Sequence, residues 1–189
     1  MGRHGAHPRP LPLTVVDRAV PFLVWTVWPY AALLLSDLVL PLFVRDPRVF
    51  RRALAAYGLA LGLNFLVWAA FPTTMHRPQV PGGGSPSEAL YRLLVAVDGA
   101  GNCFPSAHVT IPAVAVWALA RERPRWRAPL WAGLALASLS IHTTKQHYLA
   151  DLAGGFATAA LGVTASGPLL ALLGREGPAD GRGEVEPEG

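Results

Sequence analysis

His147 and Asp151 stand four residues apart at the start of an apolar stretch, and this pair could do nucleophilic chemistry. On a helix, a spacing of four residues brings two side chains together on one face. A carboxylate that accepts a hydrogen bond from one imidazole nitrogen fixes the tautomer and leaves the other nitrogen as a nucleophile. The alternative is a His–Asp pair that only tethers two helices, and for an isolated pair that is the commoner role.

A second polar run, Pro105-Ser106-Ala107-His108, also precedes an apolar stretch. Proline and serine suit the first turn of a helix, and a helix start attracts anions through its unpaired N–H groups and its dipole. We therefore predict that Ser106 and Ala107 contact an anionic substrate and that His108 protonates a leaving alkoxide. The alternative is an ordinary capped helix with a histidine at the membrane interface.

Two cations accompany these motifs. Lys145 is the only lysine in the chain, and Arg77 lies just past the end of an apolar stretch. An arginine fork matches phosphate oxygens in pairs, and a lysine supplies a point charge. Singly, each could be a cation that extends to the membrane surface. Together with two histidines and an aspartate, they predict a phosphate-binding site.

The composition places the chain among membrane proteins. Of its 189 residues, 52% are apolar and 15% are charged, whereas a soluble domain has about 25% charged residues. The net charge of +4 comes from short arginine clusters between apolar blocks, which is typical of segments beside a membrane rather than of nucleic-acid binding. A single cysteine excludes an internal disulfide.

Five apolar blocks can position these residues. They comprise residues 20–44, 53–71, 104–120, 129–144 and 149–173. Each exceeds the roughly 9–11 residues of a membrane barrel strand, so we predict an all-α bundle of about five transmembrane helices. We expect one membrane-embedded domain over residues 20–173, a disordered N-terminal arm over 1–19 and a disordered tail over 174–189.

Arginine-rich connections at 45–52 and 121–127 predict which end of the bundle faces the cytoplasm. Three polar segments then meet at the opposite, extracytoplasmic face: 72–78, 102–108 and 145–151. Residues 88–97 have the pattern of an amphipathic surface helix. We expect this helix to cover the site and to contact the substrate head group.

The motifs resemble the signatures of the type 2 phosphatidic acid phosphatase (PAP2) superfamily. The run Phe104-Pro105-Ser106-Ala107-His108 is similar to its second signature, usually Pro-Ser-Gly-His, and His147-x-x-x-Asp151 to its third. Arg77-Pro78 resembles the end of its first signature. The run from Thr143 to Tyr148, together with Asp98, is similar to a branch that contains inositol phosphorylceramide synthases and their bacterial relatives.

This resemblance implies a PAP2/haloperoxidase-like core and a metal-independent enzyme without a cofactor. His147 would take the phosphoryl group, Asp151 would orient it, and His108 would act as acid and then as base. Arg77, Lys145 and the Ser106–Ala107 helix start would hold the phosphate oxygens. The substrate would be a lipid phosphate or phosphodiester in a bacterial cell membrane, and the acceptor would be water in a phosphatase or a lipid alcohol in a phosphotransferase.

Two family cations are missing, because Ala70 and Ile141 stand where the first and third signatures usually have Lys and Arg. Lys145 could replace one of them, and His142 or His76 could replace the other. A non-catalytic lipid-binding protein with the same fold is an alternative. A small proton-coupled transporter is a weaker alternative. It would place the His–Asp pair at the middle of the bilayer, whereas the sequence places the pair at the end of an apolar block.

Overall fold

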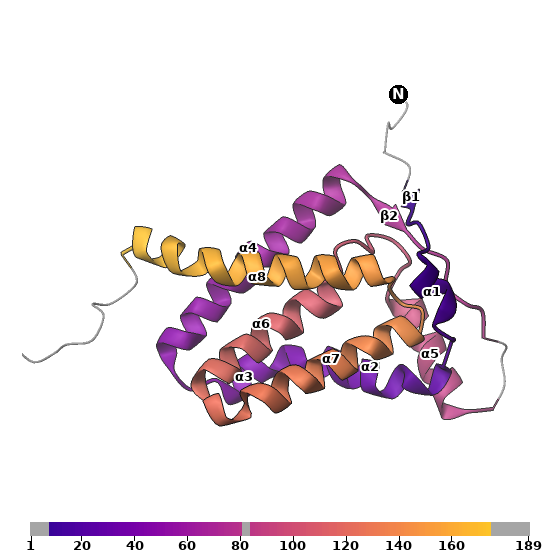
Figure 1. The fold of residues 1–189 in the computed structure, drawn as a ribbon, viewed down its shortest axis with the longest axis horizontal. Coiled ribbons are helices and arrows are strands. Elements are labelled where there is room, and N and C mark those ends of the chain that lie inside the picture. The colour runs from indigo at the N-terminus through magenta and orange to yellow at the C-terminus, as the bar shows by residue number, and fades with distance from the viewer. Residues whose placement is uncertain (1–7, 81–83, 175–189) are drawn as a thin grey trace, which may run out of the picture.

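A computed structural model describes residues 8–80 and 84–174, most of which are helical. The chain runs back and forth in five passes between two ends of an elongated bundle (Figure 1). The first pass is broken into short pieces: η1 (Val24–Thr26), α2 (Val27–Leu34), η2 (Leu35–Leu38) and α3 (Val39–Phe43). The other four are continuous helices: α4 (Pro47–Ala70), α6 (Ala107–Glu122), α7 (Arg127–Thr143) and α8 (Leu149–Leu172).

The predicted apolar blocks therefore coincide with the five passes, although the first is not one helix. Pro29 and Pro41 lie in this pass, and a proline removes a backbone donor and kinks a helix. The second pass begins at a clear sequence signal. Asp46 caps α4 by accepting from the N–H groups of Arg48 and Val49, and Pro47 follows it at the first helical position.

Small residues let the passes approach closely. A Cβ added to Gly162 of α8 would lie 2.5 Å from the carbonyl oxygen of Ala56 on α4. A Cβ added to Gly155 would lie 2.5 Å from the carbonyl oxygen of Ser106, at the start of α6. Such contacts are typical of helices that pack in a membrane.

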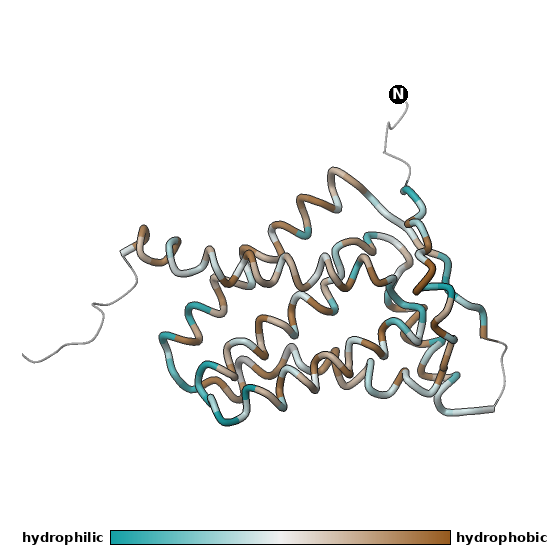
Figure 2. Tube along the Cα trace, viewed as in Figure 1, coloured by the Kyte–Doolittle hydropathy of each residue, from teal (hydrophilic) through white to brown (hydrophobic). Residues whose placement is uncertain are grey.

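Two of the helices in the described segments, α4 and α8, are long and apolar enough to cross a membrane. Helices α6 and α7 have 16 and 17 residues, and about 20 helical residues cross the hydrocarbon layer. Five crossings therefore remain a prediction. Figure 2 shows the apolar character concentrated along the helices and the polar character at the two ends of the bundle.

One end carries the two arginine-rich connections. The N–H group of Arg45 donates to both carboxylate oxygens of Glu122, at 3.1 and 2.8 Å, so the connection before α4 contacts the end of α6. The predicted polar segments lie at the other end, on the right in Figure 1. There, Asn102 N–H donates to Thr73 O at 2.8 Å, and Ser106 N–H donates to Asp151 O at 3.1 Å.

The N-terminal segment corrects a prediction. Residues 1–19 are predicted to be disordered, but the described part of this arm, from residue 8, is folded onto the polar end. Strand β1 (Arg9–Pro10) pairs in parallel with β2 (Thr73–Thr74), and helix α1 (Val15–Ala19) follows. A capping box between Thr14 and Asp17 begins α1, and Asp17 is buried. Residues 1–7 and 175–189 lie outside the described part of the chain. The predicted tail over 174–189 therefore lies outside it as well, except for residue 174.

The predicted amphipathic helix is confirmed as α5 (Pro86–Val97). It starts two residues earlier than predicted, because Ser85 and Glu88 form a capping box around Pro86. Tyr91 anchors it, with its ring edge against Phe22 and its hydroxyl donating to Pro78 O.

Candidate active site

The turn between α7 and α8 carries His147, and Asp151 follows in the first turn of α8. Their atoms Nδ1 and Oδ2 lie 3.3 Å apart, and both residues are buried. Oδ2 of Asp151 also accepts from the N–H of Tyr148 at 2.8 Å, which fixes the carboxylate. With a proton on Nδ1, the imidazole of His147 presents the lone pair of Nε2 away from the carboxylate.

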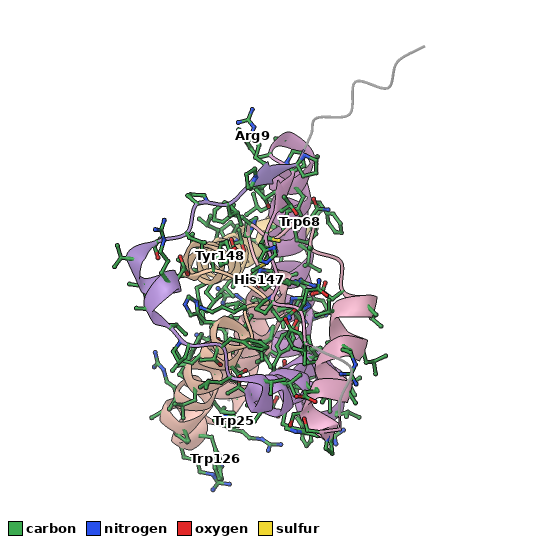
Figure 3. The ribbon with its side chains drawn as sticks, turned by 90° about the vertical axis from the view of Figure 1, so that its right-hand side faces the viewer. Arg9, Trp25, Trp68, Trp126, His147 and Tyr148 are labelled. Atoms are coloured by element: carbon green, nitrogen blue, oxygen red, sulfur yellow. The ribbon has the colours of Figure 1, made fainter. Side chains whose placement is uncertain are left out.

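His108 faces this lone pair. It lies in the first turn of α6, and its Nδ1 is 3.1 Å from Nε2 of His147. Tyr30 of α2 packs edge-on against the His108 ring, with the ring centroids 5.6 Å apart. The two predicted histidines therefore meet, although 39 positions separate them in the sequence. Figure 3, which faces this end of the bundle, places His147 inside the molecule, near the Tyr148 and Trp68 labels.

Arg77 lies in the same cavity. Its guanidinium is buried, and it donates to the main-chain oxygen of Asp98 and, at 3.0 Å, to Oδ2 of Asp98. The Nε atom of Arg77 is buried without a hydrogen-bond partner among the described residues. Asp98 is the C-cap of α5. The arginine is therefore held from one side and keeps donor capacity for an anion.

These residues surround one cavity of about 280 Å³. Its lining comes from four separate parts of the chain: Trp68, Arg77, Asp98, Gly99, Gly101, Asn102, Ala107, His108 and His147. The cavity thus combines a guanidinium, two imidazoles, a carboxylate and the first residue of a helix. The first N–H groups of a helix have no partner within it, so the start of α6 offers donors to an anion.

Ser106 differs in part from its prediction. It is the N-cap of α6, but its own N–H donates to Asp151 O and is not free for substrate. Its Oγ is buried and has no partner in the described structure. Pro105 lies before the helix rather than in its first turn. The main-chain hydrogen bond from Ser106 to Asp151 joins the start of α6 to α8. It so brings the two segments that carry the histidines together.

Lys145 does not lie in this cavity, contrary to its predicted place beside the phosphate. Its Nζ donates to the main-chain oxygens of Asp17 and Val20, at 2.6 Å each. With His76 and Arg18, it lines a neighbouring cavity of about 330 Å³. His142 is likewise directed to Asp17, with its Nε2 3.5 Å from Oδ1. These residues therefore do not supply the missing cations to the cavity of His147.

Helix α5 contributes less than predicted. Asp98 and Gly99, which follow it, line the cavity, but the lining contains no residue of α5 itself. Sequence reasoning also missed Trp68 and Asn102. Trp68 donates from Nε1 to Pro105 O at 3.2 Å, so it supports the loop before His108. A tryptophan near the end of an apolar block is also typical of an interfacial anchor, so the sequence gave no signal that would assign Trp68 to the cavity.

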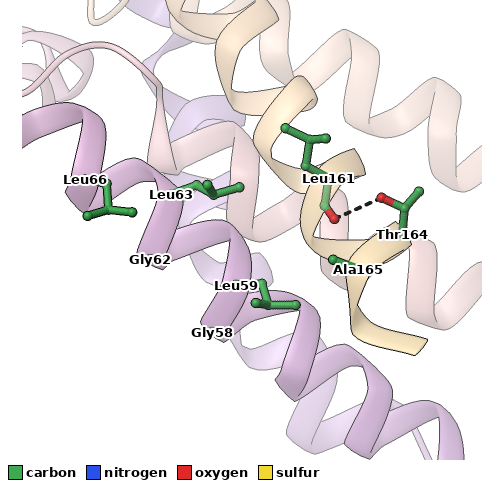
Figure 4. Close-up of a pocket in the computed structure, with 8 residues that line it drawn as sticks. All are labelled: Gly58, Leu59, Gly62, Leu63, Leu66, Leu161, Thr164 and Ala165. Carbon is green, nitrogen blue, oxygen red and sulfur yellow. Dashed lines mark hydrogen bonds between the residues drawn. The ribbon is translucent and has the colours of Figure 1, made fainter. Parts of the chain in front are cut away.

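A larger, apolar cavity of about 640 Å³ lies between α4 and α8 (Figure 4). It is lined by glycine, alanine, leucine and one threonine, and the Thr164 hydroxyl donates to Leu161 O. These side chains offer no group for acid–base or phosphoryl chemistry. Among the residues that the structure describes, no group of three or more His, Cys, Asp or Glu side chains is placed to hold a metal ion.

The fold and the cavity of His108 and His147 fit a helical enzyme that acts on a phosphate compound, and comparison with protein families agrees. Residues 5–165 match the PAP2 superfamily, and the chain belongs to this superfamily. No curated protein and no solved structure matches the chain. Membership indicates an activity of the phosphatase or phosphotransferase type. Together with the two long apolar helices, it also indicates a membrane protein.

Proposed function

We propose that the chain is an integral membrane enzyme that transfers the phosphoryl unit of a lipid phosphate or phosphodiester through a phosphohistidine at His147. The observation that carries this proposal is the chain of contacts from Asp151 through His147 to His108 beside Arg77, at the wall of one cavity. Each of these side chains has a role in phosphoryl transfer, and a merely structural His–Asp tether needs neither the second imidazole nor the guanidinium.

Substrate binding opens the contact between the two histidines. Reacting atoms lie about 3–3.5 Å apart before attack, so the phosphorus must take the place that Nδ1 of His108 occupies opposite Nε2 of His147. Arg77 and the N–H groups at the start of α6 then hold the phosphate oxygens and stabilise the charge of the transition state. In this mechanism the protein groups supply that stabilisation without a metal.

The reaction proceeds in two displacements. Nε2 of His147 forms a bond to phosphorus as the bond to the leaving alkoxide breaks, and His108 donates a proton to that alkoxide. Asp151 stabilises the positive charge that develops on the His147 ring. A water or alcohol then gives its proton to His108 and attacks phosphorus, which breaks the P–N bond and restores His147.

The branch of the superfamily is a finer proposal. The run from Thr143 to Tyr148 supports a relative of the inositol phosphorylceramide synthases. The cavity supports a weakly charged phosphate, because Asp98 stands in it beside Arg77, and Ala70 and Ile141 replace two family cations. A phosphodiester, with one negative charge, suits this balance better than a phosphomonoester does. We place the site at the extracytoplasmic face, opposite the arginine-rich connections.

A substrate panel tests this proposal. Purified protein in detergent is given phosphatidic acid, an isoprenyl phosphate and phosphatidylinositol, each with and without a lipid alcohol that differs from its own leaving alcohol as acceptor. We expect turnover of at least one of these lipids, and a loss of about 10³-fold or more in the His147→Ala variant. Equal turnover by wild type and His147→Ala would reject the mechanism. Lipid binding without turnover would favour the non-catalytic alternative.

A further inference from the structure

The turn that carries His147 has an irregular backbone and needs support. It joins α7 to α8, and Lys145 adopts a positive φ of 54° within it. Non-glycine residues adopt this conformation only where the surroundings hold it. Part of the support is local, because the N–H groups of Lys145 and Gln146 donate to His142 O and Ile141 O at the end of α7.

The rest of the support comes from the N-terminal segment. Oδ1 of Asp17 accepts from the N–H of Leu149 at 2.8 Å, although the two residues are 132 positions apart. Leu149 is the first residue of α8, so Asp17 satisfies an N–H that the helix itself leaves open and places a negative charge at the helix start. Oδ2 accepts from the N–H and the hydroxyl of Thr14, at 2.8 and 2.6 Å.

Lys145 makes the reciprocal contact. Its ammonium donates to the main-chain oxygens of Asp17, in the middle of α1, and of Val20, its C-cap, at 2.6 Å each. The N-terminal segment therefore holds the turn at Lys145 and at Leu149, two residues on either side of His147. Further bonds extend the contact to α7, including Leu23 N–H to Thr143 O at 2.9 Å.

We propose that Asp17 and Lys145 are positioning residues, which clamp the turn on both sides of His147 and make residues 14–20 part of the active-site scaffold. This inference depends on the proposed nucleophilic role of His147. The only lysine of the chain then serves to position the nucleophile and does not bind phosphate. Neither clamp residue lines the cavity of His147, so both act through the position of the imidazole.

Three variants and one control test the clamp. Asp17→Ala removes the acceptor for Leu149 N–H, Asp17→Asn keeps an amide oxygen in its place, and Lys145→Met keeps the length of the side chain without its donors. Arg18→Gln is the matched control, because Arg18 is the exposed neighbour of Asp17. Turnover is measured on the panel lipid that the wild type cleaves fastest.

We expect Asp17→Ala and Lys145→Met each to lower kcat by about 10–100-fold, because displacement of a reacting group by about 1 Å has such an effect. KM should stay within about twofold, since the phosphate ligands are untouched. Asp17→Asn should recover part of the loss, and Arg18→Gln should match the wild type. The double variant should be no worse than the poorer single one, because both changes open the same clamp.

Hydrogen–deuterium exchange on the full chain supplies a readout besides activity. In Asp17→Ala and Lys145→Met, the amides of residues 145–151 should exchange faster, while those of α4 stay protected. Unchanged exchange in both variants would overturn the clamp. A rise in KM at constant kcat for Lys145→Met, additive with Asp17→Ala, would instead assign Lys145 to phosphate. If wild type cleaves no panel lipid, the proposed function fails while the exchange measurement still decides on the clamp.

Discussion

Asp98 is the residue that sets the charge of the cavity. It binds Arg77 through both its side chain and its main-chain oxygen, and its carboxylate lies in the cavity lining. The carboxylate orients the guanidinium but repels an anionic substrate, and it repels a dianion about twice as strongly as a monoanion. If the cavity binds the phosphate, as proposed, we expect it to discriminate between phosphate classes by charge.

Replacing Asp98 should therefore change substrate preference. In Asp98→Asn, we expect the ratio of kcat/KM for a phosphomonoester to that for a phosphodiester to rise by roughly tenfold, because a nearby negative charge is lost. Glu122→Gln, at the other end of the bundle, is the matched control for removal of a carboxylate. An unchanged ratio in Asp98→Asn would show that this carboxylate does not face the bound phosphate.

Cys103 gives a prediction on thiol reactivity. The side chain is fully buried and directed to Ala100 O, and burial, with the charge of Asp151 adding to it, raises the pKa of the thiol to about 12. Because the thiolate is the reactive form, Cys103 should not react with maleimide in the folded protein at pH 7.4 and should react fully in SDS. Rapid labelling of the folded protein would contradict this placement of the loop before α6.

At the scale of elements, close contact between α6 and α8 brings the histidines together. Gly155 permits this contact, since a Cβ there would lie 2.5 Å from Ser106 O and 3.0 Å from the Cβ of Val109. The same turn of α6 carries His108. Any separation of α6 from α8 near Gly155 therefore also separates His108 from His147.

Gly155→Ala should consequently lower both stability and activity. We expect the free energy of unfolding to fall by about 1–3 kcal/mol, as for other overpacked sites, with a lower Tm in detergent and a lower kcat. Gly58→Ala on α4 is the control, because a Cβ there meets nothing within 4 Å. If both variants have the same Tm as the wild type, α6 and α8 are not packed as closely as in this structure.

The order of the helices, and the end of the bundle at which each one begins, could be predicted from the sequence, since apolar blocks and arginine clusters repeat along the chain. That regularity also predicted that segments around Arg77, His108 and His147 meet at one end. The N-terminal segment could not be predicted from hydropathy, because its order depends on contacts such as Asp17 with Leu149, 132 positions away. One local signal existed, since Thr14-x-x-Asp17 has the pattern of a capping box.

Lys145 illustrates a second limit of the sequence. Its place two residues from His147 is equally compatible with a phosphate ligand and with a structural donor. The choice depends on the backbone at Lys145, whose φ is 54°, and on carbonyl groups supplied by residues 17 and 20. Neither can be derived from residue types alone.

For the whole molecule, five crossings require the site and the arginine-rich connections to lie on opposite sides of a membrane. Ser85 and Arg125 are exposed near the two respective ends. In Ser85→Cys and Arg125→Cys variants, an impermeant maleimide should label intact cells only at position 85, and inverted vesicles only at position 125. Because Cys103 is expected not to react with maleimide in the folded protein, wild type serves as the control. Labelling of both positions from one side would contradict five crossings.

The most direct test of the central claim is the capture of the phosphoryl group on the protein. Purified protein is incubated briefly with the ³²P-labelled panel lipid that it cleaves fastest, quenched in SDS, and divided between acid and alkali. We expect wild type to carry label that acid removes and alkali retains, as a phosphoramidate bond requires, and His147→Ala to carry none. Acid-stable label, or equal labelling of His147→Ala, would contradict nucleophilic attack by this histidine.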